Sequence, residues 1–186
     1  YLGRKENHLM KITVYLGAFE GKGDTLRNAA TELGRWVAES GNTLVYGGSK
    51  TGLMGVLATS ALDAGGEVIG VEPTYFMELD HQLDTLTELI VTDTMAERKA
   101  KMIELGEAFI AFPGGTGTLE EIAEVMSRVS LKQLDAPCIF YNLNGYYNHM
   151  KAFLQTMKDE GLSSDERQKG IHFADTLEDI RKILAY

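Results

Sequence analysis

The chain has 186 residues, a formal net charge of -9 and a pI near 4.9. This acidic balance argues against a nucleic-acid-binding protein, which usually presents a basic face. The single cysteine, Cys138, excludes an internal disulfide and any metal site built from several cysteines. We find no apolar stretch long enough to cross a membrane and no apolar segment typical of a signal peptide, so we expect a cytoplasmic protein.

The first nine residues differ from the rest of the chain. They are polar and lack an initiator methionine, whereas Met10 directly precedes the first apolar run. We therefore expect the native chain to begin at Met10 and residues 1–9 to be expression-derived or disordered. Residues 10–186 contain no linker or internal repeat, which predicts a single domain.

Short apolar runs alternate with helical patterns along the chain. In order, the predicted elements are a strand at 11–16, a helix at 24–40, a strand at 43–46, a helix at 53–64, strands at 67–71 and 88–92, a helix at 95–105, a strand at 107–112, a helix at 118–134, a strand at 137–141, a helix at 146–160, a polar loop at 161–169, a strand near 171–173 and a helix at 176–184. Asp24 is a plausible N-cap of its helix, and Asp93 or Thr94 can cap the helix at 95–105. This alternation predicts an α/β fold with a Rossmann-like, doubly wound parallel sheet flanked by helices on both faces.

Glycine-rich segments follow three of the predicted strands, at 17–23, 47–55 and 114–117. In a doubly wound fold ligands bind beyond the carboxyl ends of the strands, so these segments can converge on one pocket. The glycines at 17–23 are equally compatible with a simple tight turn. None of the segments matches the dinucleotide or P-loop patterns, so we expect no nicotinamide, flavin or other cofactor, and a mononucleotide or small phosphorylated ligand instead.

The run Phe112–Glu121, with sequence FPGGTGTLEE, carries the strongest signal. A glycine-rich turn that enters a helix exposes backbone N–H groups at the positive end of the helix dipole, which suits a phosphate. We place Glu121 in the first turn of that helix, beside the bound phosphate. Glu120 and Glu124 can reflect only the preference of helix N-termini for negative charge.

A second cluster, Arg98 and Lys99, follows the predicted strand at 88–92. In an acidic chain this pair is a plausible anion clamp, because a guanidinium can grip phosphate with two parallel hydrogen bonds. Lys101 is better explained as a solvated side chain. The histidines are scattered without metal-ligand spacing, so we assign no metal; they are His8, His81, His149 and His172.

Three segments together resemble the Lonely Guy (LOG) family: YGGSKTGLMG at 46–55, MAERK at 95–99 and PGGTGTLEE at 113–121. The resemblance covers residues 10–186 and includes the NGYYN segment at 144–148. It implies cleavage of the N-glycosidic bond of an N6-modified adenosine 5'-monophosphate, which releases the free base and ribose 5-phosphate. It also implies a homo-oligomer, with a dimer favoured, whose site lies near the subunit boundary.

By the same resemblance, Arg98 and Glu121 would be the catalytic pair. The residues expected to bind the substrate are Gly17, Ala18, Gly48, Met95, Lys99, Gly114, Gly115, Thr116, Gly117 and Thr118, of which the last four would hold the 5'-phosphate. A carboxylate below the ribose can stabilise an oxocarbenium-like transition state or orient water. Arg98 can hold the phosphate or ribose, or stabilise charge on the departing base.

Two departures from the family pattern concern the base. Ala18 stands where relatives carry the serine of C-G-S, and residues 128–132 read RVSLK where relatives carry W-x-Q-L-G. The residues expected to cleave the glycosidic bond are present, whereas these two departures leave the identity of the preferred base undetermined. A non-catalytic nucleotide or phospho-ligand carrier is the alternative function. An amino-acid decarboxylase is disfavoured, because no segment supplies the pyridoxal-binding lysine and larger fold that such enzymes use.

Overall fold

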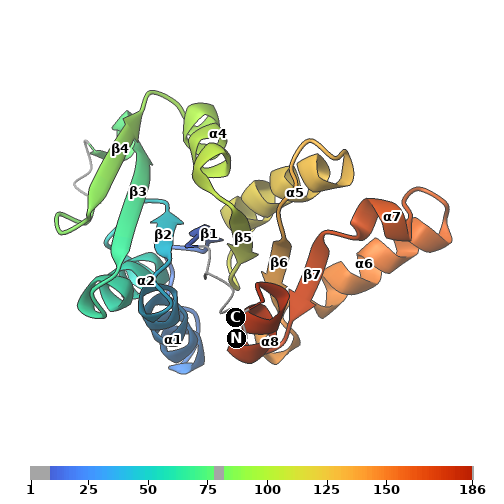
Figure 1. Cartoon of the computed structure of the whole chain (residues 1–186), viewed down its shortest axis with the longest axis horizontal. Coiled ribbons are helices and arrows are strands. Elements are labelled where there is room, and N and C mark those ends of the chain that lie inside the picture. The colour runs from blue at the N-terminus through green and yellow to red at the C-terminus, as the bar shows by residue number, and fades with distance from the viewer. Residues whose placement is uncertain (1–8, 78–81, 186) are drawn as a thin grey trace, which may run out of the picture.

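The computed structural model of the chain describes residues 9–77 and 82–185, and within them the strands form one parallel sheet (Figure 1). The strands are β1 (Lys11–Tyr15), β2 (Thr43–Tyr46), β3 (Glu67–Pro73), β4 (Glu88–Thr92), β5 (Ala108–Ala111), β6 (Cys138–Tyr141) and β7 (Ile171–Ala174). Their order across the sheet is β4-β3-β2-β1-β5-β6-β7, and every neighbouring pair is parallel. The predicted Rossmann-like, doubly wound α/β fold is confirmed.

Helices connect the strands and cover both faces of the sheet (Figure 1). They are α1 (Thr25–Glu39), α2 (Gly52–Asp63), α3 (Thr74–Met77), α4 (Met95–Leu105), α5 (Thr116–Ser130), α6 (Asn148–Asp159), α7 (Asp165–Gln168) and α8 (Leu177–Ile183), with a 3-10 turn at Leu143–Gly145. None of the described helices is both long and apolar enough to span a membrane. The expectation for residues 1–9 falls almost wholly outside the described part of the chain.

The strand order reverses at the centre of the sheet. From β1 the chain adds β2, β3 and β4 on one side, and after α4 it returns to place β5 on the other side of β1. Ile12 of β1 is in register with Leu44 on one side and Ala108 on the other. The carboxyl ends of β1, β2 and β5 therefore lie next to one another, and a crevice is expected there because the connections leave in opposite directions.

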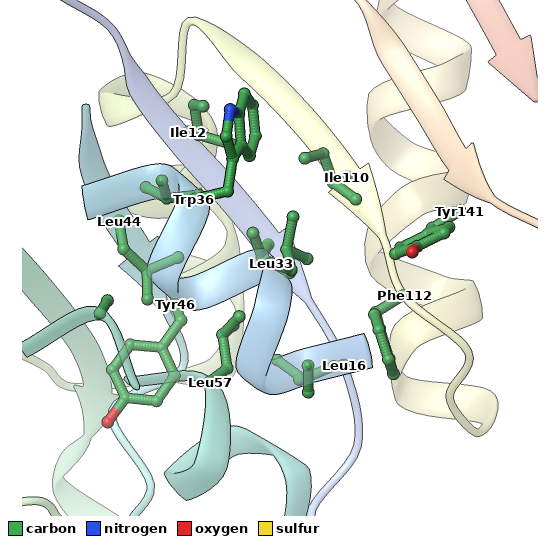
Figure 2. Close-up of a cluster of buried hydrophobic side chains, with 14 of the residues drawn as sticks. Ile12, Leu16, Leu33, Trp36, Leu44, Tyr46, Leu57, Ile110, Phe112 and Tyr141 are labelled. Carbon is green, nitrogen blue, oxygen red and sulfur yellow. The ribbon is translucent and has the colours of Figure 1, made fainter. Parts of the chain in front are cut away.

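One hydrophobic core lies between the sheet and the helices α1, α2 and α8 (Figure 2). On α1 the buried apolar residues recur every three or four positions, which turns one face of the helix toward the sheet; they are Ala29, Ala30, Leu33, Trp36 and Val37. Leu33 and Leu57 are fully buried against the strand residues Leu44 and Ile110. Each such leucine contributes about 2 kcal/mol by leaving water, so this core holds the strand ends in fixed positions.

A second core lies on the opposite face, below α4, α5 and the start of α6. Met102, Ile122 and Val125 from the helices pack against Phe109 and Phe140 of the strands. Both faces of the central strands are thus covered, which explains why all four residues of β5 are buried. The two helices α4 and α5, which carry the predicted catalytic residues, are therefore anchored to the sheet by the same core.

Helix α5 begins earlier than predicted. The carbonyl of Gly115 already accepts a hydrogen bond from the N–H of Leu119 at 3.1 Å, so the first helical turn starts at Thr116. The placement of Glu121 in the first turn was wrong, since it lies in the second. The helix also ends at Ser130 instead of residue 134, because Lys132 adopts a left-handed conformation with φ of 56°.

Other local differences concern short helices and caps. The segment predicted as a polar loop at 161–169 contains α7, whose N-cap Ser164 accepts a hydrogen bond from the N–H of Arg167 at 3.2 Å. The N-cap of α4 is Thr94, whose hydroxyl accepts from the N–H of Glu97 at 3.1 Å. Asp24 occupies the N-cap position of α1, but its side chain makes no capping hydrogen bond.

Candidate active site

A cavity of about 390 Å³ opens at the carboxyl ends of β1, β2, β3 and β5, where the strand order reverses. Four segments provide its walls: the turn after β1, the turn after β2, the end of β3 with α3, and the β5–α5 turn facing α4. The residues that line it are Leu16, Gly17, Ala18, Phe19, Gly47, Ser49, Thr51, Met54, Glu72, Phe76, Met95, Arg98, Lys99, Gly115, Thr116, Gly117, Thr118, Glu120 and Glu121. The three glycine-rich segments of the sequence therefore converge on one pocket.

The β5–α5 turn forms one end of the cavity. A Cβ at Gly115 or Gly117 would meet no atom within 4 Å, so the backbone here is open to a ligand. Both residues sit at the N-terminus of the fifteen-residue helix α5, whose free N–H groups and dipole favour an anion. Thr118 lines the same cavity, and its hydroxyl is buried and has no hydrogen-bond partner among the described residues. An oxygen-rich anion such as phosphate would provide the missing partner.

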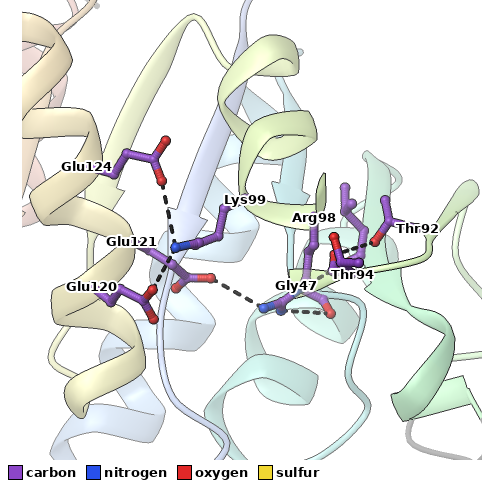
Figure 3. A network of polar contacts seen from close by, with 9 residues as sticks. Gly47, Thr92, Thr94, Arg98, Lys99, Glu120, Glu121 and Glu124 are labelled. Carbon is purple, nitrogen blue, oxygen red and sulfur yellow. Dashed lines mark hydrogen bonds and ion pairs between the residues drawn. The ribbon is translucent and has the colours of Figure 1, made fainter. Parts of the chain in front are cut away.

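Arg98 lies at the floor of the cavity and is held by the backbone of two strands (Figure 3). Its Nε donates to the carbonyl of Val71 at 2.9 Å, and its Nη2 donates to the carbonyl of Gly47 at 3.2 Å. A Cβ on Gly47 would collide with this guanidinium, so a glycine is required for Arg98 to lie here. A guanidinium has five N–H donors, and those at Nη1 point toward the α5 side of the cavity.

Glu121 faces Arg98 across the cavity, with Oε1 3.4 Å from Nη1 (Figure 3). The two side chains are only 11% and 10% exposed. Burial raises the pKa of Glu121 to about 7, an effect that the positive charge of Arg98 opposes only in part. A carboxyl group with a pKa near neutrality can exchange a proton with a reacting group at physiological pH, so Glu121 suits acid–base chemistry.

Lys99 lines the cavity, but its ammonium group is paired with α5. It donates to Glu120 at 2.6 Å and lies 3.8 Å from Glu124, which in turn accepts from Arg128 at 2.7 Å. The hydrogen bond to Glu120 raises the pKa of Lys99. Glu120 and Glu124 thus have a role that helix charge preference did not predict, because they tie α4 to α5 beside the cavity.

The other end of the cavity is formed by Glu72, Phe76 and Met95. Glu72 lies at the end of β3, which is three strands away from β5, so this end is roughly 14 Å from the β5–α5 turn at a strand spacing of about 4.8 Å. Glu72 is only 1% exposed. An aromatic ring, a thioether and a buried carboxylate can together contact a flat heterocycle that carries N–H or O–H donors.

Most of the predicted site residues line the cavity; these are Gly17, Ala18, Met95, Arg98, Lys99, Gly115, Thr116, Gly117, Thr118 and Glu121. Two predicted residues lie behind the lining. Gly48 adopts a left-handed φ of 85° beside Glu72, and a Cβ on Gly114 would collide with Thr118, so both shape the turns instead of facing the cavity. Glu72 and Phe76 were not predicted. A signal existed for Glu72, since it is a charged residue that follows the apolar run Val68–Val71.

Comparison with known proteins identifies relatives of this chain in sequence and in structure. A family model described as "Possible lysine decarboxylase" matches residues 54–184. The cytokinin riboside 5'-monophosphate phosphoribohydrolase of Rhodococcoides fascians is 44% identical over 151 residues, which cover 81% of this chain and 76% of that protein. The rice enzyme of the same name, LOG, from Oryza sativa subsp. japonica, is 35% identical over 178 residues, or 96% of this chain and 74% of that protein.

Solved structures with the same fold include proteins named for carrying or binding the molybdenum cofactor. The molybdenum cofactor carrier protein of Chlamydomonas reinhardtii has a TM-score of 0.70 and 23% identity, over 96% of this chain and all of that one. The molybdenum cofactor binding protein of Rippkaea orientalis has a TM-score of 0.69 and 22% identity, over 96% of each chain. At this identity the likeness shows the fold alone. The family model and the relatives in sequence show more, and by them the chain belongs to the Lonely Guy (LOG) family.

Proposed function

We propose that this protein hydrolyses the N-glycosidic bond of adenosine 5'-monophosphate or its N6-substituted forms, and releases the free base and ribose 5-phosphate. The observation that carries the proposal is the Arg98–Glu121 pair, buried between a phosphate-binding turn and an apolar pocket. The names of the relatives in sequence, cytokinin riboside 5'-monophosphate phosphoribohydrolases, support the same activity.

The geometry suggests how a nucleotide would lie. The 5'-phosphate would bind the N–H groups of Gly115 and Gly117 and the hydroxyl of Thr118, and the base would lie between Phe76 and Met95. The roughly 14 Å between these ends suits a nucleoside monophosphate, and the ribose would then lie over the centre of the crevice. There the C1'–N9 bond would be close to Glu121.

In this arrangement water adds to C1' while the C1'–N9 bond breaks with its electron pair leaving on the base. The deprotonated carboxylate of Glu121 would stabilise the oxocarbenium-like sugar and accept the proton of the attacking water, and this proton would then pass to the departing base, which leaves the carboxylate ready for the next turnover. The carboxylate must be charged for this role, and burial holds its pKa at about 7, so it is a stronger base than an exposed glutamate. Arg98 would hold that carboxylate and the ribose in place instead of gripping the phosphate, because two backbone carbonyls fix it over β2 and β3.

The description of the family model as lysine decarboxylase fits the site poorly. A lysine that forms a Schiff base reacts as the neutral amine, and enzymes favour that form by lowering its pKa. Lys99, which lines the cavity, has the opposite environment, since hydrogen bonding to Glu120 raises its pKa. Absorbance of the purified protein at neutral pH tests this directly, and a pyridoxal band would support the decarboxylase function.

Product analysis by liquid chromatography is the test of the proposal. The substrates are AMP, N6-isopentenyl-AMP, the other nucleoside monophosphates and adenosine, and we expect release of free base from the first two but not from adenosine. The Glu121→Gln variant should fold and bind AMP but release no base. Base release by this variant at the wild-type rate would refute the role of Glu121.

The same samples distinguish a glycosidase from a non-catalytic carrier. A carrier would bind AMP in isothermal titration and leave it intact, whereas the proposed enzyme would generate adenine during the titration. A carrier has no use for a buried carboxyl group whose pKa is held near 7, and this favours the enzyme.

We also propose that the protein is a homodimer, as the family resemblance implies. Exposed apolar side chains beside the cavity support it: Met95 at the start of α4 is 44% exposed and Leu119 on α5 is 43% exposed. Analytical ultracentrifugation should give a mass of about 41 kDa, twice the 20.5 kDa of one chain. A mass of one chain at micromolar concentration would contradict the dimer.

A further inference from the structure

The segment Asn144–Asn148, with sequence NGYYN, is not part of the proposed catalytic pair or of the cavity lining, yet it touches the phosphate-binding turn. It connects β6 to α6, and β6 is the strand next to β5. The hydroxyl of Tyr146 donates to the carbonyl of Gly114 at 2.7 Å, and the hydroxyl of Tyr147 donates to the carbonyl of Phe112 at 2.7 Å. Two adjacent tyrosines therefore hold two carbonyls that flank Pro113.

The bond from Tyr146 sets the direction of one N–H group. In a trans peptide the carbonyl and the N–H of the same unit point in opposite directions. The carbonyl of Gly114 shares its peptide unit with the N–H of Gly115, so holding the carbonyl toward Tyr146 turns this N–H the other way. The nitrogen of Gly115 lies beside the β1 turn, since a Cβ built on Gly17 would be 3.9 Å from it, and both residues line the cavity.

The tyrosines are themselves held rigidly. The N–H of Tyr147 donates to Oδ1 of Asn142 at 2.7 Å, and Nδ2 of Asn142 donates to Asn148 at 2.9 Å and to Asp175 at 2.7 Å. Asn142 is 4% exposed. The ring of Tyr147 packs edge-on against the ring of Tyr146, with centroids 5.0 Å apart. This network ties the connection between β6 and α6 to the end of β7, and the ring of Tyr147 in turn supports the ring of Tyr146.

We propose that Tyr146 is a positioning residue for phosphate recognition: it orients the Gly114–Gly115 peptide so that the N–H of Gly115 faces the ligand before binding. Tyr147 fixes the preceding end of β5. The inference rests on the proposed function, in which this turn binds the 5'-phosphate. A turn with three glycines, Gly114, Gly115 and Gly117, has many accessible conformations, and an external hydrogen bond reduces the entropy that binding would otherwise cost.

The Tyr146→Phe variant tests the proposal, because Tyr146 is 52% exposed and its hydroxyl should matter little for stability. We expect KM for AMP to rise about threefold to tenfold, the size of one net hydrogen bond, while kcat and the melting temperature stay unchanged. The matched control is Tyr141→Phe, which removes a hydroxyl that bonds to the backbone of Leu177 at the start of α8, and keeps the ring that packs against Phe112. Its KM should equal that of the wild type, and an equal rise in both variants would overturn the proposal.

Hydrogen exchange in the ligand-free protein provides a second measurement that does not depend on activity. We expect faster exchange of the amides at 114–118 in Tyr146→Phe than in the wild type or in Tyr141→Phe. Unchanged exchange together with unchanged KM would refute the positioning role. If the wild type neither binds nor cleaves AMP, the proposed function fails, whereas faster exchange at 114–118 would still support the hydrogen bond as the element that orders the turn.

Titration with ribose 5-phosphate and with adenosine separates phosphate recognition from general damage to the site. Affinity for ribose 5-phosphate should fall in Tyr146→Phe by the same factor as KM rises. Affinity for adenosine, which has no phosphate, should not change. An equal loss for both ligands would contradict the proposal, because it would place the effect outside the phosphate-binding turn.

Discussion

Glu121 is expected to make the folded protein less stable as the pH rises, because its pKa is higher in the folded state than in the unfolded chain. Burial raises that pKa from 4.5 to about 7. The folded state therefore binds the proton more tightly than the unfolded chain does. The contribution of this proton to the free energy of unfolding is fully present below pH 4.5 and is lost as the pH rises toward and through 7. The cost of the buried charge is about 1 kcal/mol at pH 5 and about 3 kcal/mol at pH 8 when the two pKa values are inserted in the linkage relation.

The Glu121→Gln variant removes this cost at every pH. The amide oxygen of glutamine can still accept from Arg98, so any loss from the weakened contact is the same at both pH values. Relative to the wild type, the variant should therefore gain about 2–3 kcal/mol of unfolding free energy between pH 5 and pH 8. For a domain of this size such a gain corresponds to a rise in melting temperature of roughly 5–10 °C.

Urea unfolding followed by circular dichroism at pH 5 and pH 8 measures the effect. Glu160→Gln is the control, since Glu160 is exposed at the end of α6 and does not line the cavity. An identical pH dependence of stability in the wild type and in Glu121→Gln would refute the reasoning, because it would mean that the carboxyl group titrates in the folded protein as it does in water.

Three further predictions concern the floor and the two ends of the cavity. Gly47→Ala should leave the fold intact but displace the guanidinium of Arg98, with which the new Cβ collides, and lower kcat about 100-fold in a base-release assay. Thr118→Val should raise the melting temperature, because it removes a buried hydroxyl that has no partner among the described residues, and yet raise KM for AMP about tenfold. Glu72→Leu removes a buried carboxylate from the base end and should raise kcat/KM for N6-isopentenyl-AMP relative to AMP about tenfold, as measured with both substrates in competition. Unchanged kinetics in these variants would contradict the respective assignments.

The order of strands and helices could be predicted from the sequence, because each element has its own hydrophobic pattern. The apolar runs of β1, β2 and β5 are covered by helices, so the residues that the sequence predicted to be buried strands are buried in the structure. The glycine-rich segments after these strands identified the cavity for the same reason, since the carboxyl ends of parallel strands share one edge. The short helices α3 and α7 were missed, because four residues have too little periodicity to reveal a helix.

The electrostatics of the site could not be predicted from sequence spacing. Lys99 was expected to clamp an anion, but whether its ammonium faces a ligand or Glu120 depends on how α4 and α5 approach each other in space. The pKa of Glu121 likewise depends on burial, which the pattern of one helix does not determine. Glu72 was overlooked because a charged residue at the end of an apolar strand is usually exposed, whereas here it is buried and the turn after β2 packs against it.

The anchoring of Arg98 has a consequence for how this pocket can diversify. Its two acceptors at the end of β2 and in β3 are main-chain carbonyls, which every amino acid possesses. Side chains along the base end can therefore be exchanged without loss of the hydrogen bonds that orient the guanidinium, as long as Gly47 is kept. Libraries that randomise Glu72 and Phe76 should thus yield altered base preference with the cleavage step preserved, and they make this scaffold suitable for evolving nucleotide glycosidases with new leaving groups.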